Sequence, residues 1–212
     1  MEYNKIKNAE EKINNSKYLI KNPRNYKNKW HDLFQNHNPI YLELGTGRGD
    51  FLFNMAKKYP NINFIGVEIN SSQLVRATQI LENSNLKNIY LINMDARDLV
   101  SVFGKEIDTI YLTFSEPWPK KRDEKNRFTH ESFLKIYDQI FKKDKHIILK
   151  TDNASLFAYS LESLSKYWYV FNIVSLNLHN DERNISNIMT DFEKQYFKEK
   201  RPIYYLDAYF KN

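Results

Sequence analysis

The 212-residue chain contains no cysteine. Without thiols it has no disulfides, no thiolate zinc site and no iron–sulfur cluster, which excludes radical chemistry that starts at such a cluster. It also excludes enzymes that attack a pyrimidine carbon with a cysteine nucleophile. The amino-terminal segment is charged, and no apolar run approaches the length of a membrane span. We therefore expect a cytoplasmic protein.

Glycine is scarce as well: of five glycines, three are Gly45, Gly47 and Gly49. An apolar stretch over 40–44 precedes them, and a stretch with helical periodicity over 50–58 follows. A strand, a glycine turn and a helix bring backbone N–H groups and a helix amino terminus close to a ligand. The pattern predicts a nucleotide-cofactor site.

The residues around this turn favour S-adenosylmethionine over a nicotinamide cofactor. The dinucleotide fingerprint is G-x-G-x-x-G, but here Asp50 stands where the third glycine is expected. Glu43 would repel a pyrophosphate, whereas it suits a cofactor with an amino group and a sulfonium. Glu68 ends the second expected strand, where an acid accepts ribose hydroxyls, and Asp95 ends the third, beside the adenine. The alternative is that such acids only cap the next helix.

Strand and helix patterns alternate from residue 40 onward, which predicts a doubly wound α/β sheet. The two last strands, separated by one helix, match the antiparallel edge of class I methyltransferases. We expect a Rossmann-like, seven-stranded, mostly parallel sheet in a single domain over 36–212, preceded by a basic arm over 1–35. The expected strands are 40–45, 63–69, 89–94, 108–114, 145–150, 170–178 and 203–210; the expected helices are 49–58, 71–83, 97–102, 130–142, 153–165 and 190–199.

Positive charge is concentrated in two places. The net charge is +6, residues 1–29 hold eight Lys/Arg against three acids, and residues 120–127 hold five against two. Such runs are often only solvated faces. Together with the cofactor pattern, they favour contact with a nucleic acid.

The segment 114–122 follows the fourth expected strand and reads Phe-Ser-Glu-Pro-Trp-Pro-Lys-Lys-Arg. Ligands of open α/β sheets lie beyond the carboxyl ends of the strands, so this segment should face the transferred methyl group. Pro117 and Pro119 stiffen it. Trp118 between them suits either base stacking or packing on the core, and Lys120 is placed to reach a phosphate.

This segment closely resembles the Asp-Pro-Trp-Pro-Lys-Lys-Arg signature of the bacterial tRNA (guanine-N7-)-methyltransferases, which modify a variable-loop guanosine (position 46 of the tRNA). The resemblance covers most of residues 30–205. Its other marks are Glu-Leu-Gly-x-Gly-x-Gly from Glu43, Gly-Val-Glu at 66–68, Lys-Thr-Asp-Asn at 150–153 and Thr-Asp-Phe-Glu at 190–193.

The resemblance implies S-adenosylmethionine as cofactor, tRNA as partner, no metal, and a monomer or homodimer. It implies a role for each of the following residues: Glu43, Gly45, Gly47, Gly49, Glu68, Asp95 and Glu116 for the cofactor, Glu116 also at the catalytic position, Lys120, Asp152, Thr190 and Glu193 for the guanosine, and Lys121, Arg122, Lys125 and Arg127 for RNA. The chain departs in two places. Glu116 replaces the family aspartate, and acids dilute the basic run.

The chemistry of guanine N7 fits these residue types. N7 carries a lone pair and no proton, so attack on the sulfonium methyl group needs alignment rather than a strong base. Three rivals are a small-molecule methyltransferase on the same fold, a non-catalytic RNA-binding protein with a decayed loop, and a nicotinamide oxidoreductase. The basic clusters disfavour the first, the intact glycines and acids the second, and the glycine spacing the third.

Overall fold

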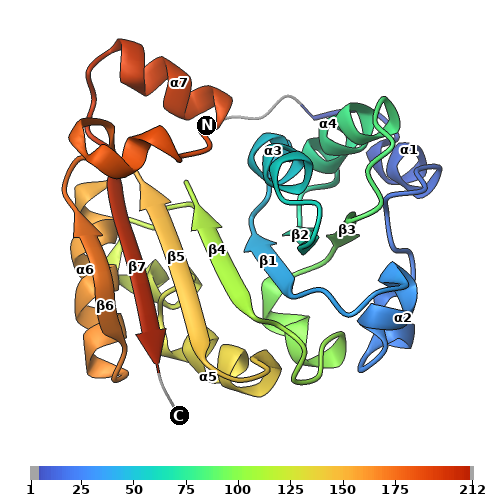
Figure 1. Cartoon of the computed structure of the whole chain (residues 1–212), viewed down its shortest axis with the longest axis horizontal. Coiled ribbons are helices and arrows are strands. Elements are labelled where there is room, and N and C mark those ends of the chain that lie inside the picture. The colour runs from blue at the N-terminus through green and yellow to red at the C-terminus, as the bar shows by residue number, and fades with distance from the viewer. Residues whose placement is uncertain (1–4, 211–212) are drawn as a thin grey trace.

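Seven strands form one sheet in the order β3-β2-β1-β4-β5-β7-β6 (Figure 1). This computed structural model describes residues 5–210. Strands β1 to β5 are parallel, and β7 runs antiparallel to β5 and β6. The expected fold class is confirmed. The bounds are β1 Ile40–Leu44, β2 Asn63–Glu68, β3 Ile89–Asn93, β4 Thr109–Thr113, β5 Lys145–Thr151, β6 Val170–Ser175 and β7 Tyr204–Phe210.

Helices lie on both faces of this sheet, and α3 to α7 agree with the expected ranges. The short helix expected near 97–102 is a turn of 3₁₀ helix. The α-helices are α1 Ala9–Asn14, α2 Trp30–Phe34, α3 Asp50–Lys58, α4 Ser71–Glu82, α5 Glu131–Ile140, α6 Ala154–Lys166 and α7 Asp191–Lys198; the 3₁₀ turns are η1 Pro23–Tyr26, η2 Ala96–Ser101, η3 Lys121–Asn126, η4 Leu178–Asn180 and η5 Glu182–Ile185.

Strand alternation divides the apolar side chains between two cores. Ile65 and Val67 of β2 point into a core shared with α5 and α6, whereas Phe64 points into a core shared with α3 and α4. Successive side chains of a strand face opposite sides of the sheet, so a continuous apolar strand such as β2 serves both layers. Strand β2 is therefore buried on both faces, whereas the edge strand β6 is largely exposed. The carboxyl ends of the parallel strands are left for a ligand.

The basic amino-terminal segment differs from the expected arm. Ile13 of α1 is buried against α4, Leu19 pairs with Leu91 of β3, and Trp30 of α2 is fully buried. Trp30 also donates its indole N–H to the Val102 carbonyl. Residues 5–35 thus pack on the domain because their apolar side chains complete both cores. Residues 1–4 lie outside the described part.

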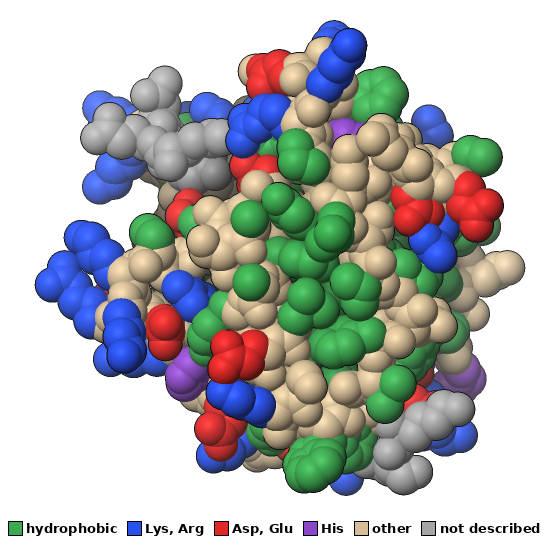
Figure 2. Space-filling model, turned by 90° about the vertical axis from the view of Figure 1, so that its left-hand side faces the viewer, with side chains coloured by type: hydrophobic (Ala, Val, Ile, Leu, Met, Phe, Trp, Pro, Cys, Tyr) green, Lys and Arg blue, Asp and Glu red, His purple; other side chains and the backbone are tan. Residues whose placement is uncertain are grey.

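The opposite end of the sheet is an apolar surface. Figure 2 shows hydrophobic side chains gathered on the face that carries β6. Val170 and Val174 of β6 and Leu176, the residue after it, are large and exposed. Within the described part of the chain, strand β6 pairs on one side only, with β7. Among residues 5–210, no helix is both long and apolar enough to cross a membrane. The expected oligomeric state stays a prediction.

Candidate cofactor and substrate site

A cavity of about 530 Å³ opens at the carboxyl ends of β1 to β4. Four successive strand ends contribute to its wall, which is the position where the order of the sheet reverses between β1 and β4. Its size is that of a small-molecule site. The residues that line this cavity include Gly45, Gly47, Glu68, Ile69, Asn70, Met94, Asp95, Phe114, Ser115, Glu116, Trp118, Asn126, Phe128 and Phe133.

The glycine turn needs its glycines. Gly45, Gly47 and Gly49 have φ of +71°, +55° and +77°, the left-handed region that side chains disfavour. A Cβ on Gly49 would lie 2.9 Å from the Cβ of Ala77, closer than real contacts. The turn is also tied to the next strand, because Gly45 N–H donates to the Val67 carbonyl at 2.8 Å. This hydrogen bond holds the turn beside the cavity.

Glu68, which ends β2, and Asp95, two residues after β3, both line the cavity and both hold local backbone. Glu68 accepts from the N–H groups of Gly47, at 3.0 Å, and Asn70, at 2.8 Å. Burial raises the pKa of Glu68. Asp95 accepts from the backbone and guanidinium of Arg97, at 2.8 and 2.7 Å. Asp95 is thus also the cap of η2, and the capping alternative describes part of its role. The cap of α4 is Asn70, not Glu68.

Glu43 lies beneath the glycine turn rather than in the cavity wall. Glu43 is 2% exposed, and its side chain accepts from the Thr46 hydroxyl. Burial raises the pKa of Glu43 to about 7, while hydrogen bonds from Thr46 and Thr113 and the charge of Lys150 limit the rise. The charge state of Glu43 is therefore set first by burial and then by its neighbours.

A buried ion pair joins β5 to α7. Lys150 Nζ lies 2.7 Å from Glu193 Oε2, and these side chains are 5% and 0% exposed. Lys150 also donates to Asn187 Oδ1 and to the Ile188 carbonyl, at 3.1 and 2.8 Å. Burial lowers the pKa of Lys150, and Glu193 counteracts that change. Thr190 caps α7 by accepting from Glu193 N–H. The Glu193 carboxylate is thus occupied inside the protein, and its predicted contact with guanosine stays a prediction.

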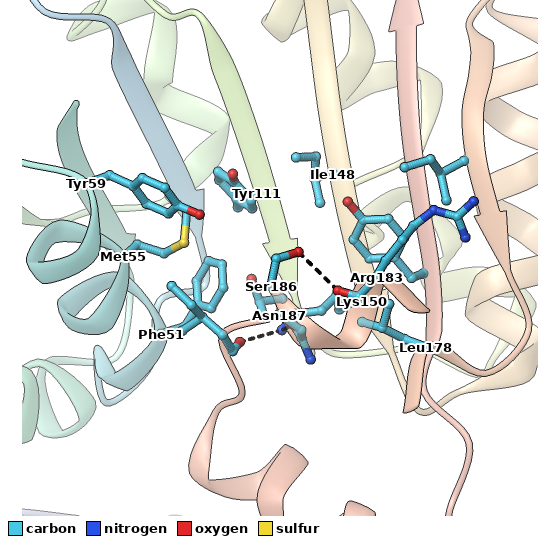
Figure 3. Close-up of a pocket in the computed structure, with 14 residues that line it drawn as sticks. Phe51, Met55, Tyr59, Tyr111, Ile148, Lys150, Leu178, Arg183, Ser186 and Asn187 are labelled. Carbon is cyan, nitrogen blue, oxygen red and sulfur yellow. Dashed lines mark hydrogen bonds between the residues drawn. The ribbon is translucent and has the colours of Figure 1, made fainter. Parts of the chain in front are cut away.

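Lys150 also borders a second cavity of about 270 Å³, between α3 and the segment 178–188. Figure 3 shows Phe51, Met55 and Tyr59 on one side of this cavity and Lys150, Leu178 and Arg183 on the other. The Lys150 ammonium lies 4.9 Å from the centre of the Phe51 ring. The ammonium thus connects the start of α3, which follows the glycine turn, with the segment that leads into α7.

The loop after β4 lies beside the predicted guanosine residues. The ring centres of Phe114 and Tyr196 of α7 are 6.3 Å apart. Asp152 accepts from Arg201 at 3.0 Å, and that guanidinium lies over the Tyr196 ring. Lys120 is exposed where the loop enters η3. The structure therefore brings Asp152 and the loop together around α7.

Comparison with known proteins agrees with this geometry. Residues 37–206 match the profile of the family described as "Putative methyltransferase". A tRNA (guanine-N(7)-)-methyltransferase of Geobacillus thermodenitrificans is 47% identical, covering 90% of this chain and 88% of its own length. The Bacillus subtilis protein of the same name is 46% identical, covering 90% and 89%. The chain belongs to the tRNA (guanine-N7-)-methyltransferase family.

Solved structures agree on the fold of this family member. A 16S rRNA methyltransferase, KamB, aligns with a TM-score of 0.66 at 9% identity, covering 87% of this chain and 94% of its own. An antibiotic-related methyltransferase also gives 0.66, at 15% identity, covering 86% and 94%. The arrangement is thus that of class I methyltransferases.

Within this tRNA (guanine-N7-)-methyltransferase, the expected RNA contacts divide into two groups. Lys121, Arg122 and Lys125 are exposed on η3. Arg127 is only 7% exposed, and its guanidinium donates to backbone carbonyls, so the expectation that it touches RNA does not fit this structure. The two groups differ in burial, and the spacing of basic residues in the sequence does not predict which of them are buried.

Lys150 is a site residue that sequence reasoning left without a role. It opens the Lys-Thr-Asp-Asn motif at 150–153, which was the available signal. Its partner Glu193 is 43 positions away in the chain, so the pair forms only when α7 folds back over β5.

Proposed function

We propose that this protein transfers the methyl group of S-adenosylmethionine to N7 of a guanosine in the tRNA variable loop. One observation carries the proposal: the cavity is walled by the glycine turn, Glu68, Asp95 and the Ser-Glu-Pro-Trp loop. Relatives about 46% identical over nearly the whole chain are tRNA (guanine-N(7)-)-methyltransferases. A cytoplasmic enzyme that binds tRNA, as monomer or homodimer, is the corresponding expectation.

The carboxylates in and beneath the cavity wall suit this cofactor. Glu68 keeps carboxylate lone pairs beyond those used by Gly47 and Asn70, and these suit ribose hydroxyls. Asp95 borders the cavity beside Met94, which suits the adenine end. Glu43, beneath the turn, supplies the negative charge for the methionine amino group. Bound there, S-adenosylmethionine supplies an electrophilic methyl group.

The residues of the acceptor side orient the guanine. N7 attacks with its lone pair, so no side chain has to remove a proton. Glu116 is exposed on the cavity wall, where its carboxylate can accept from the guanine N–H edge. We expect Lys120, Asp152 and Thr190 to contact the nucleoside, and the exposed Lys121, Arg122 and Lys125 to contact phosphates. Glu116 is an orienting group in this scheme.

The product identifies the reaction. Incubation with methyl-labelled S-adenosylmethionine and unmodified tRNA should give 7-methylguanosine at one variable-loop position. Because the role of Glu116 is to accept hydrogen bonds, Glu116→Gln should retain more activity than Glu116→Ala. Digestion of the tRNA and chromatography of the nucleosides test both points. A label on an exocyclic amine, on ribose or only on a small molecule would contradict the proposal.

Cofactor affinity tests Glu68. Glu68→Ala should weaken S-adenosylhomocysteine binding by roughly 1.5–3 kcal/mol, the range for a hydrogen bond to a charged group. Calorimetry gives the affinity. Because Glu68 also holds Gly47, Glu68→Gln serves as the control, since it keeps an acceptor and should lose less. Unchanged affinity in Glu68→Ala would remove this carboxylate from the site.

A further inference from the structure

The loop between β4 and η3 has an unusual backbone. Phe114 and Trp118 have φ of +53° and +44°, values that non-glycine residues rarely adopt. Such residues persist only where their surroundings hold them, and they gather at functional sites. Phe114 is held by its N–H, which donates to the Lys150 carbonyl at 2.8 Å. Between these two residues lies Glu116, on the cavity wall.

Arg127 holds the other end of this loop. Its Nε donates to the Pro117 carbonyl at 3.1 Å, and its Nη2 to the Trp118 carbonyl at 2.9 Å. The guanidinium carbon lies 4.3 Å from the centre of the Tyr159 ring on α6, and Nη1 lies 3.6 Å from Glu124. The planar fork thus fixes two successive carbonyls while its flat face rests on a helix.

We propose that Arg127 is a positioning residue for methyl transfer: it holds the Pro117 and Trp118 carbonyls and so sets Glu116 and Trp118 along the cofactor cavity. The role rests on the proposed function, because those two side chains border the cavity in which the methyl donor would lie. A lysine lacks the fork, so the role requires arginine. A phosphate contact, in contrast, requires only positive charge and exposure, which Lys121 and Lys125 have.

The variants Arg127→Lys and Arg127→Met separate these two roles, with the exposed Lys125→Ala as the matched control. All are made in a Trp168→Phe background, so that fluorescence comes from Trp118, 39% exposed, and the fully buried Trp30. Three measurements are needed: time-resolved anisotropy of Trp118 without RNA, kcat at saturating cofactor and tRNA, and the salt dependence of tRNA affinity.

We expect both Arg127 variants to lose about tenfold or more in kcat, since small misplacements at a reacting centre are costly. Both should show faster local motion of Trp118, and neither should change the salt slope. Lys125→Ala should lower the slope by about one, as expected for one lost phosphate contact, without changing the Trp118 anisotropy. The positioning role therefore predicts that lysine does not rescue Arg127.

Two results would overturn the proposal. The first is the behaviour of a phosphate contact. In that case Arg127→Lys would have normal kcat and normal anisotropy, and Arg127→Met would lower the salt slope of tRNA affinity by about one. The second is normal Trp118 motion and normal kcat in the Tyr159→Leu variant. This substitution removes the ring on which the Arg127 guanidinium rests, and it tests the proposal even where the Arg127 variants do not fold. Failure of the wild type to form 7-methylguanosine would reject the proposed function, whereas the RNA-free anisotropy would still test whether Arg127 holds the loop.

Discussion

Replacing Glu43 by glutamine should stabilise the free protein at pH 8 by up to about 3 kcal/mol. The folded-state pKa of Glu43, about 7, lies above its unfolded value of 4.5. Between these values the folded protein holds a proton that the unfolded chain releases, so stability falls as the pH rises through this window. Glutamine has no proton to lose. Urea unfolding should show the gain at pH 8 and little of it at pH 5.

The same substitution should weaken binding of S-adenosylmethionine. Wild-type affinity should fall up to about tenfold from pH 8 to pH 6, because Glu43 must ionise to meet a cation. In Glu43→Gln, affinity should be low and independent of pH over this range. Equal pH profiles for the two proteins, measured by calorimetry, would show that Glu43 does not titrate with cofactor binding.

Replacing Lys150 by methionine should cost about 3–5 kcal/mol, the range for breaking a buried ion pair. The substitution leaves Glu193 buried without its partner and removes the positive charge that limits the pKa of Glu43. Glu43 takes up a proton as the pH falls below about 7, so the part of the cost that comes from Glu43 should shrink between pH 8 and pH 6. Urea unfolding at pH 8 and pH 6 measures both effects.

Two further variants separate the buried pair from a general loss of charge. Lys135→Met makes the same substitution in the exposed Glu131–Lys135 pair on α5 and should change stability little. Lys150→Met combined with Glu193→Gln should be less destabilised than the two single changes would predict together, because no carboxylate is left unpaired. A cost for Lys150→Met as small as that of Lys135→Met would contradict the buried pair.

Local patterns in the sequence predicted the sheet and the glycines and acids that line the cavity. Gly45, Gly47 and Gly49 are required by backbone angles that other residues disfavour, and Glu68 and Asp95 follow strands whose apolar runs are easily recognised. In a parallel sheet the ends of successive strands meet at one edge. Sequence positions therefore translated directly into spatial neighbours.

The tertiary structure alone decided the roles of charged residues. In the sequence Arg127 and Lys125 are equivalent members of one basic run, yet the first lies under a loop and on Tyr159 while the second is exposed. The amino-terminal segment looked like a basic arm, but Trp30 and Ile13 complete the cores. The ion pair between Lys150 and Glu193 forms only because α7 packs against the end of β5. Burial and long-range pairing depend on how distant segments pack, and no local pattern encodes them.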